Sequence, residues 1–177
     1  MEKKIQDWDA ETFFRILTAT NKLCKQHKFV YCRVSGLQGF EEVLNKAQSE
    51  KAFICCSSDA DGYTTLNNTP HTRRVKTVFI AMRHAVNRMD LRNSCMETMR
   101  EVFRQFMSVL IREKTKLENN HIYLDSRIQF SEIEQYFAQG TACAYFNIAT
   151  DIFTDLRFDS EEWDEKAFTE QFNKSFI

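Results

Sequence analysis

Glycine and proline are scarce in this chain, with four glycines and one proline among 177 residues. A Gly-rich loop that cradles phosphate needs several glycines close together, and no such loop is present, nor is the G-x-S-x-G turn of a serine hydrolase. Tight turns should be few, with connections built from Asn, Asp and Ser. These absences argue against a nucleotide-binding enzyme, and we expect no cofactor.

A dominant charge and a long apolar run are also absent. The formal net charge at pH 7 is −1, which creates no overall field that would attract nucleic acid or an anionic membrane. No apolar segment approaches the roughly 18 residues of a membrane-spanning helix, and the N-terminus lacks the apolar run of a signal peptide. We expect a soluble protein that is made in a cytoplasm and has no membrane partner.

Six cysteines lie within apolar segments, at spacings unlike those of a disulfide framework: Cys24, Cys32, Cys55, Cys56, Cys95 and Cys143. We expect reduced, buried thiols. Side chains suited to zinc occur at Cys55, Cys56, His71, His84 and Cys95, but their spacing matches no zinc motif. Nothing in the sequence orients Cys143 and His121 as a nucleophile and its base. We therefore expect no metal site and no catalytic residue.

Phenylalanine, by contrast, is abundant, with sixteen copies in a chain that is 43% hydrophobic. Residues 1–177 are expected to form a single domain with a substantial core. Within it we distinguish a compact body of about residues 73–156, a polar loop over residues 57–72 and a C-terminal aromatic segment, 158–177. The loop is either a functional or mobile element or the tip of a β-hairpin between the strands that flank it.

The most regular pattern runs through the body. Residues 73–82, 122–130 and 141–156 alternate as strands do, and residues 90–118 keep an apolar helical stripe. We expect that helix to start with Asp90 as its N-cap, to end at Asn119-Asn120 and to span roughly 40 Å. These segments predict a sheet with a long helix laid across it.

Shorter elements flank this pattern. Asp9 is expected to cap a helix that runs to about residue 27, followed by strands over 29–34 and 51–56 with a helix between them, an order compatible with a parallel crossover. Two further predictions are a capping box at Ser131 and Glu134 that starts a short helix closed by Gly140, and a C-terminal helix capped by Asp159 or Ser160. The predicted fold class is α+β: a small mixed or antiparallel β-sheet packed against one long central helix, with N- and C-terminal helices.

Acidic residues offer one enzymatic hypothesis. Asp59 and Asp61 form a D-x-D pair in the polar loop, and Asp125, Asp151 and Asp155 lie in or at the ends of predicted strands, where carboxylates often bind divalent ions. A metal-dependent nuclease that uses Asp59, Asp61, Asp125 or Asp151 is therefore an alternative function. Turn chemistry explains the D-x-D pair equally well.

Interaction surfaces are the other hypothesis. A basic cluster flanks the strand over residues 78–82, with Arg73, Arg74 and Lys76 before it and Arg83, His84 and Arg88 after it. This cluster either faces a nucleic-acid backbone or protects a strand edge from aggregation. The aromatic C-terminus docks either on the chain's own core or on a neighbouring subunit, and an intracellular adaptor that binds a partner through it is a further alternative. The candidate interface residues are Tyr63, Leu66, Arg73, Arg74, Phe158, Trp163, Phe168, Phe172 and Phe176.

The order of these elements resembles the tail-terminator, or tail-completion, proteins of tailed bacteriophages, which join head and tail. The segment TRRVKTVFIAMRHAVNRMD resembles the strand before that family's main helix, DLRNSCMETMREVFRQFMSVLIREK resembles the helix, and IYLDSRIQFSEIEQYFAQGTACAYFNIATDI resembles its closing strands. The similarity covers roughly residues 10–156. Head-completion and adaptor proteins of the phage neck share the same pattern.

The resemblance implies a structural virion protein rather than an enzyme. It implies a homo-oligomeric ring of six copies that caps the tail tube, contacts tail-tube and neck or adaptor proteins, and lets DNA pass without sequence-specific binding. It implies a location in the virion after synthesis in the cytoplasm of a bacterial host. It transfers no catalytic residue, no metal and no cofactor to this chain.

Overall fold

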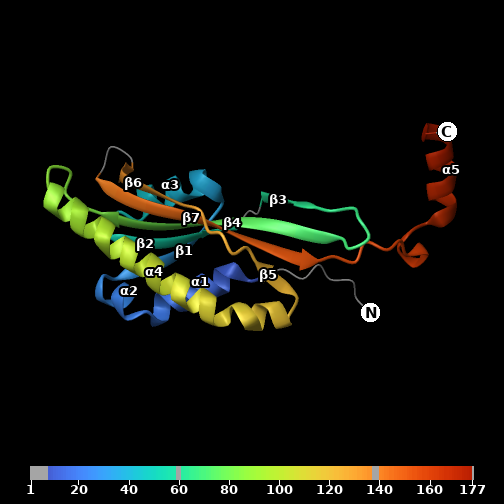
Figure 1. Cartoon of the computed structure of the whole chain (residues 1–177). Coiled ribbons are helices and arrows are strands. Elements are labelled where there is room, and N and C mark those ends of the chain that lie inside the picture. The colour runs from blue at the N-terminus through green and yellow to red at the C-terminus, as the bar shows by residue number, and fades with distance from the viewer. Residues whose placement is uncertain (1–7, 59–60, 137–139, 177) are drawn as a thin grey trace.

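A computed structural model describes residues 8–58, 61–136 and 140–176, and shows a seven-stranded mixed sheet with five α-helices (Figure 1). The helices are α1 (Ala10–Thr20), α2 (Lys22–Gln26), α3 (Gly36–Lys46), α4 (Met89–Asn119) and α5 (Glu165–Phe176), with a 3₁₀ turn, η1 (Ser160–Glu162). The strands are β1 (Phe29–Val34), β2 (Ala52–Ser57), β3 (Asp61–Thr64), β4 (His71–Arg83), β5 (Ile122–Leu124), β6 (Phe130–Tyr136) and β7 (Thr141–Phe153). The predicted α+β class with a mixed sheet is confirmed.

Two long strands, β4 and β7, form the centre of the sheet. They pair antiparallel from His71 opposite Phe153 to Arg83 opposite Thr141. The strand order is β1-β2-β4-β7-β5, with β3 on β4 and β6 on β7. β1 and β2 are parallel and joined through α3, which confirms the predicted crossover.

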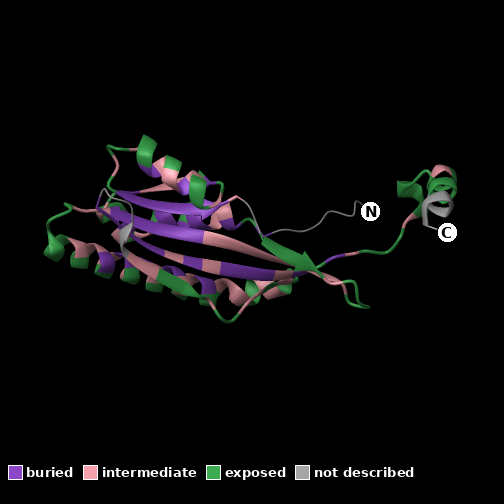
Figure 2. Ribbon diagram, turned by 90° about the horizontal axis from the view of Figure 1, so that it is seen from above, coloured by how far each residue is buried: buried purple, intermediate pink, exposed green. Residues whose placement is uncertain are grey.

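Helices cover the two faces of the sheet unequally. Even-numbered residues of β4 and β7, such as Val78 and Phe146, join α1 and α4 in the larger core. Odd-numbered residues, such as Phe79 and Cys143, join α3 in a smaller one. Figure 2 shows the buried residues concentrated in the strands and on the sheet-facing sides of the helices.

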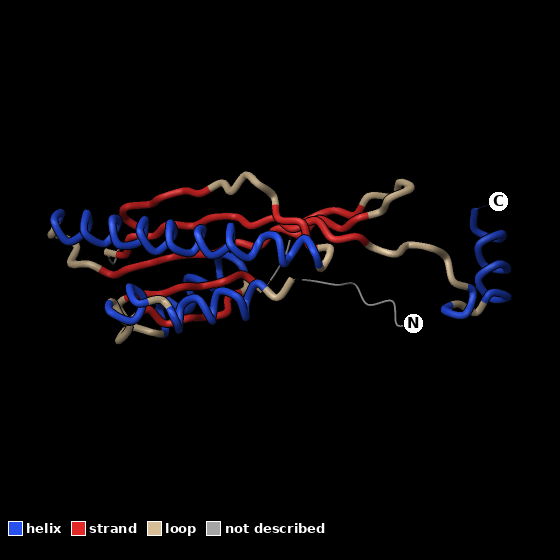
Figure 3. The backbone as a smooth tube through the Cα atoms, turned by 60° about the horizontal axis from the view of Figure 1, so that its bottom comes forward, coloured by secondary structure: helices blue, strands red, loops and turns tan. Residues whose placement is uncertain are grey.

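The central helix α4 extends along one side of the sheet (Figure 3). Its buried residues advance by three or four positions, which places them on one side: Met96, Met99, Val102, Phe106 and Leu110. The predicted end at Asn119 is confirmed, but the prediction that Asp90 is the N-cap is wrong. Arg88 occupies the cap position, and the Asp90 carboxylate accepts hydrogen bonds from the Arg88 guanidinium.

The first predicted helix is divided at Asn21. Asp9 caps α1 as expected, accepting a hydrogen bond from the Thr12 amide at 2.8 Å. Asn21 then adopts an extended backbone conformation, and its side chain accepts a bond from the Cys24 amide that starts α2. An asparagine side chain competes with the helical backbone in this way, so apolar periodicity alone did not reveal the break.

The prediction of a short helix after Ser131 is wrong. Residues 130–136 form β6, which pairs antiparallel with β7, and Glu132 binds the Arg100 guanidinium of α4 at 2.6 Å. The capping-box signal is local, whereas pairing with β7 gives backbone partners to residues 130–133 and, after a register shift, to Tyr136. The strand expected over residues 122–130 is also divided, between β5 and β6.

The polar segment 57–72 is the tip of a β-hairpin, which is one of the two alternatives predicted for it. β3 pairs antiparallel with the first residues of β4. Gly62 is required there, because a Cβ at this position would lie 1.7 Å from the Arg73 carbonyl oxygen.

Beyond β7 the chain leaves the body. Residues 154–176 form an arm in which an extended linker leads to η1 and α5, and α5 stands clear of the sheet in Figures 1 and 3. Both buried core clusters draw on residues between Trp8 and Ile152.

Phe106 tests the larger core. Its ring is almost fully buried and its centroid lies 5.9 Å from that of Phe14, so Phe106→Ala should lower the free energy of unfolding by about 3–5 kcal/mol. Urea denaturation followed by circular dichroism measures the change. Phe168→Ala, in the exposed arm, is the control and should change it by less than about 0.5 kcal/mol.

Candidate interaction surfaces

The arm carries a small aromatic cluster. Phe158 stacks on Trp163 at 6.4 Å between ring centroids, and Trp163 contacts Phe168 at 5.6 Å. Phe158 is 62% exposed and Trp163 is 53% exposed. Figure 2 shows most residues of the arm whose burial is described as exposed. Large aromatic side chains in the open are typical of contact surfaces.

Hydrogen bonds hold the cluster in shape. The Asp159 carboxylate caps η1 by accepting a bond from the Glu161 amide at 3.1 Å. The Asp164 carboxylate accepts a bond from the Ala167 amide at 3.1 Å, which caps the first turn of α5. Trp163 lies between the two caps, so its backbone is constrained on both sides.

An apolar groove of about 300 Å³ lies between α4 and the segment that joins β5 to β6. Its walls are apolar side chains from both elements: Phe103, Met107, Leu110, Ile111, Leu124 and Ile128. Lys114 and Asp125 add one charge of each sign. Ile111 is 75% exposed, an unusual position for a large aliphatic side chain.

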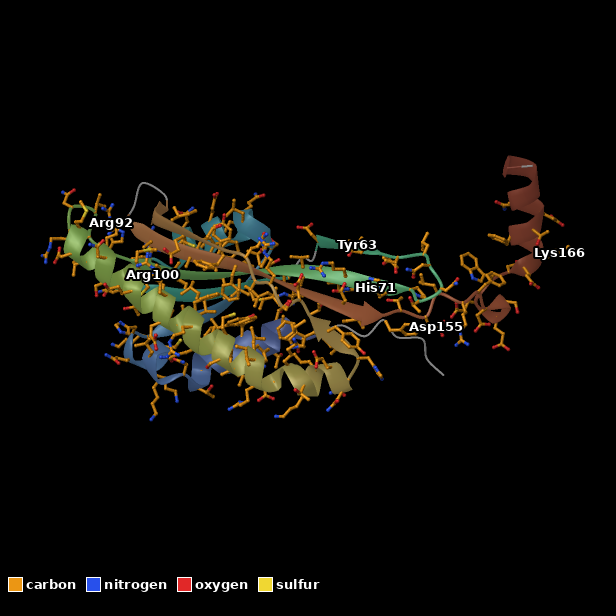
Figure 4. All side chains as sticks on the ribbon, in the orientation of Figure 1. Tyr63, His71, Arg92, Arg100, Asp155 and Lys166 are labelled. Atoms are coloured by element: carbon orange, nitrogen blue, oxygen red, sulfur yellow. The ribbon has the colours of Figure 1, made fainter. Side chains whose placement is uncertain are left out.

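The hairpin residues predicted as interface candidates lie together on the paired strands β3 and β4 and their turn. Tyr63 is opposite Arg73 in the β3–β4 ladder, and its ring meets the His71 ring edge-on at 6.5 Å. Leu66, in the turn, is 89% exposed. Figure 4 shows Tyr63 and His71 on this hairpin, with Asp155 and Lys166 farther along the arm. An interface role for these residues stays a prediction.

Arg73 has internal partners. Its guanidinium donates to the Asp151 carboxylate of β7 at 2.6 Å and to the Asp125 carboxylate after β5. One cation therefore ties together β4, β7 and the start of the β5–β6 segment. The basic cluster does not face outward as a whole, because the Arg73 guanidinium binds carboxylates of the same chain.

The same network bears on the nuclease hypothesis. Asp125 and Asp151 converge, but on a guanidinium rather than on an open site. Asp61 lies on exposed β3, Asp155 pairs with Arg157 at 2.7 Å, and Asp59 lies outside the described residues. Among residues 8–58, 61–136 and 140–176, no three His, Cys, Asp or Glu side chains are grouped to hold a metal ion.

The cysteines are free thiols, and neighbouring ones face opposite ways. Cys55 belongs to the smaller core and Cys56 to the larger one, as strand geometry predicts. His121 precedes β5, which pairs with the far end of β7 from Cys143. The structure therefore does not bring Cys143 and His121 together.

The sequence predicted the aromatic C-terminal segment but not the apolar groove. The arm's aromatic residues were conspicuous in a chain terminus, which is usually polar. Among the groove residues, Ile111 is the one that the sequence could have indicated, because it is an apolar residue next to the α4 stripe but outside it. Phe172 and Phe176 lie in α5, and the positions of their side chains are outside the described structure.

Asp125 makes stability depend on pH. The Arg127 amide and then the Arg73 guanidinium hold the pKa of the Asp125 carboxyl below its usual 3.8. The folded state thus binds fewer protons than the unfolded state just below pH 4, and the stabilisation is present at neutral pH and lost as pH falls through the lowered pKa. Asp125→Asn should cost about 1 kcal/mol at pH 7 and less at pH 3, measured by urea denaturation. Equal losses at both pH values would contradict this, and Asp61→Asn, on the exposed strand, is the control.

Cys32 should be the most reactive thiol. It lies opposite Cys55 in the β1–β2 ladder, and a hydrogen bond from Cys55 lowers the pKa of Cys32, whereas burial raises the pKa of Cys24, Cys56 and Cys143 to about 12. Iodoacetamide at neutral pH should modify Cys32 first, as read by peptide mass spectrometry. Cys55→Ala should slow that reaction by roughly tenfold, and Cys56→Ala, on the opposite face, should not.

Comparison with known proteins does not assign the chain to a group. No protein-family model matches it, and no curated protein matches it. Within the part of the chain that the structure describes, no helix is both long enough and apolar enough to cross a bilayer.

Proposed function

We propose that this protein is a structural subunit of the phage head–tail junction: a ring-forming tail terminator that caps the tail tube and joins it to the neck. The observation that carries the proposal is the arm, which leaves a complete body and presents Phe158 and Trp163 to solvent. A chain built in this way is suited to joining other subunits.

The body supports the same function. A long helix packed along a sheet gives a stiff unit, and the β3–β4 hairpin and the arm project from the same end of it (Figure 1). A head-to-tail ring needs such a unit together with projections that meet the next subunit. The element order also follows the order on which the resemblance rests, apart from the division of the first helix, the added strand β3 and β6 in place of a short helix.

The acidic residues favour this function over the nuclease. Asp125 and Asp151 have Arg73 as their counter-ion, so a metal ion there would have to displace a guanidinium held by both carboxylates. The near-neutral net charge of −1 suits a channel that DNA passes without being held. The protein acts through surfaces, in the virion, after synthesis in the bacterial host cytoplasm.

Assembly is the direct test. Purified protein, alone or mixed with tail-tube subunits, should form a closed ring of six copies, measured by mass photometry and seen as annular particles by electron microscopy. Rings that arrest elongation of tail tubes in vitro would identify a terminator. Rings that bind only head connectors would instead identify a head-completion or adaptor protein. Monomers under every one of these conditions would refute the proposal.

A further inference from the structure

We infer that the arm of one copy binds the apolar groove of a second copy, with Trp163 as the anchoring side chain. The occupant of the groove is thus the segment around η1 and the start of α5, supplied by the neighbouring subunit. This inference rests on the proposed self-assembly and names the contact that produces it.

The arm has the chemistry of an anchor. Trp163 is half exposed, stacks on Phe158 and is held between the caps of η1 and α5. A tryptophan whose backbone is already ordered loses little entropy on binding. Four carboxylates flank it in the sequence Glu161-Glu162-Trp163-Asp164-Glu165. The partner surface must therefore combine an apolar slot with positive charge.

The groove supplies the apolar slot. The largely exposed Ile111 and the partly buried Phe103 and Met107 line it. The groove volume of about 300 Å³ is at the lower end of the range for binding pockets, which is enough for one or two aromatic side chains. Lys114 lines the groove but lies 3.7 Å from the Glu118 carboxylate, and Asp125 shares the Arg73 guanidinium with Asp151, so the positive charge that attracts the arm comes from the body as a whole.

Charge is complementary over the whole chain as well. Residues 154–177 contain seven acidic and three basic residues, a net charge of −4. Residues 1–153 contain 18 acidic and 21 basic residues, a net charge of +3. The arm is thus attracted to a body and repelled by another arm, which favours arm-to-body contacts between copies.

The root of the arm directs it away from its own groove. The Thr154 amide donates to the Pro70 carbonyl at 3.0 Å, and the hydroxyls of Thr154 and Thr72 lie 2.7 Å apart. These bonds fasten Thr154 to the hairpin at the end of the sheet, and the chain continues outward from there (Figure 4). An arm docked on its own body would have to turn back at once.

Two single substitutions test the arm and the groove separately. Trp163→Ala removes the anchoring side chain from the arm, and Ile111→Glu places a carboxylate in the groove. Both side chains are at least half exposed, so both variants should fold, and circular dichroism would check this. Each should raise the dissociation constant of self-assembly by roughly thirty-fold or more. Trp163→Phe should restore most of the affinity, and Ile16→Glu, at a half-exposed position of α1, is the matched control for the groove variant.

Mixing the two variants is the decisive experiment. The Trp163→Ala protein keeps an intact groove and the Ile111→Glu protein keeps an intact arm, so the mixture contains one functional contact per pair. Mass photometry should show monomers for each variant alone and a one-to-one dimer, but no ring, for the mixture. Absence of a dimer in the mixture would overturn the inference, and so would an unaltered protein that stays monomeric because its arm docks on its own groove.

Failure of the inference is distinguishable from failure of the proposed function. If the unaltered protein forms rings and both variants form them equally well, the arm–groove contact is refuted while the terminator function stands. If the unaltered protein forms only dimers or open chains that Trp163→Ala abolishes, the contact stands and the terminator function is refuted.

Discussion

The antiparallel pairing of β4 with β7 is the constraint on which the rest of the structure depends. Its register assigns alternate residues to α4 on one face and α3 on the other, so a slip of one residue would exchange the two cores. The same register sets Arg73 opposite Asp151, where the guanidinium also reaches Asp125. The paired part of β7 ends next to Thr154, whose hydroxyl bonds to that of Thr72 and so fastens the arm to the hairpin. The two cores, the ion pairs of Arg73 and the direction of the arm therefore all depend on the register of β4 and β7.

Much of this pairing could be predicted because the signals are local. Alternation predicts β1, β4 and β7, a compact apolar run predicts β2, and the three-and-four spacing of α4 predicts both its length and its buried side. The wrong prediction at Ser131 has a distant cause. The Ser131 capping box is a sound local signal, but β7 offers most of that segment backbone partners. At Asn21, a single amide side chain ends one helix and starts the next, a choice to which apolar periodicity is blind.

The interaction surfaces divide in the same way. Five aromatic residues in a chain terminus are visible in the sequence, and the interface alternative for the arm came from them. The groove needs α4 and the β5–β6 segment side by side, which no sequence window contains. Arg73 appeared as part of a basic cluster because its two carboxylate partners lie 52 and 78 residues away. Spacing along the chain reveals a strand or a helix, whereas a site built from three segments appears only once the sheet is assembled.

Both buried cores draw on residues of the body, and the acidic arm lies outside them. In the proposed assembly, joining copies would therefore be a separate step with its own free energy, driven by apolar contact and opposite charge. Arm and groove are different surfaces, so each proposed contact would be head-to-tail and would leave one arm and one groove unfilled at the ends of any open chain. Whether such a chain closes depends on the angle between successive copies. The bonds that hold Thr154 to the hairpin, together with the caps of η1 and α5, restrict that angle, so they would decide between a ring and a filament.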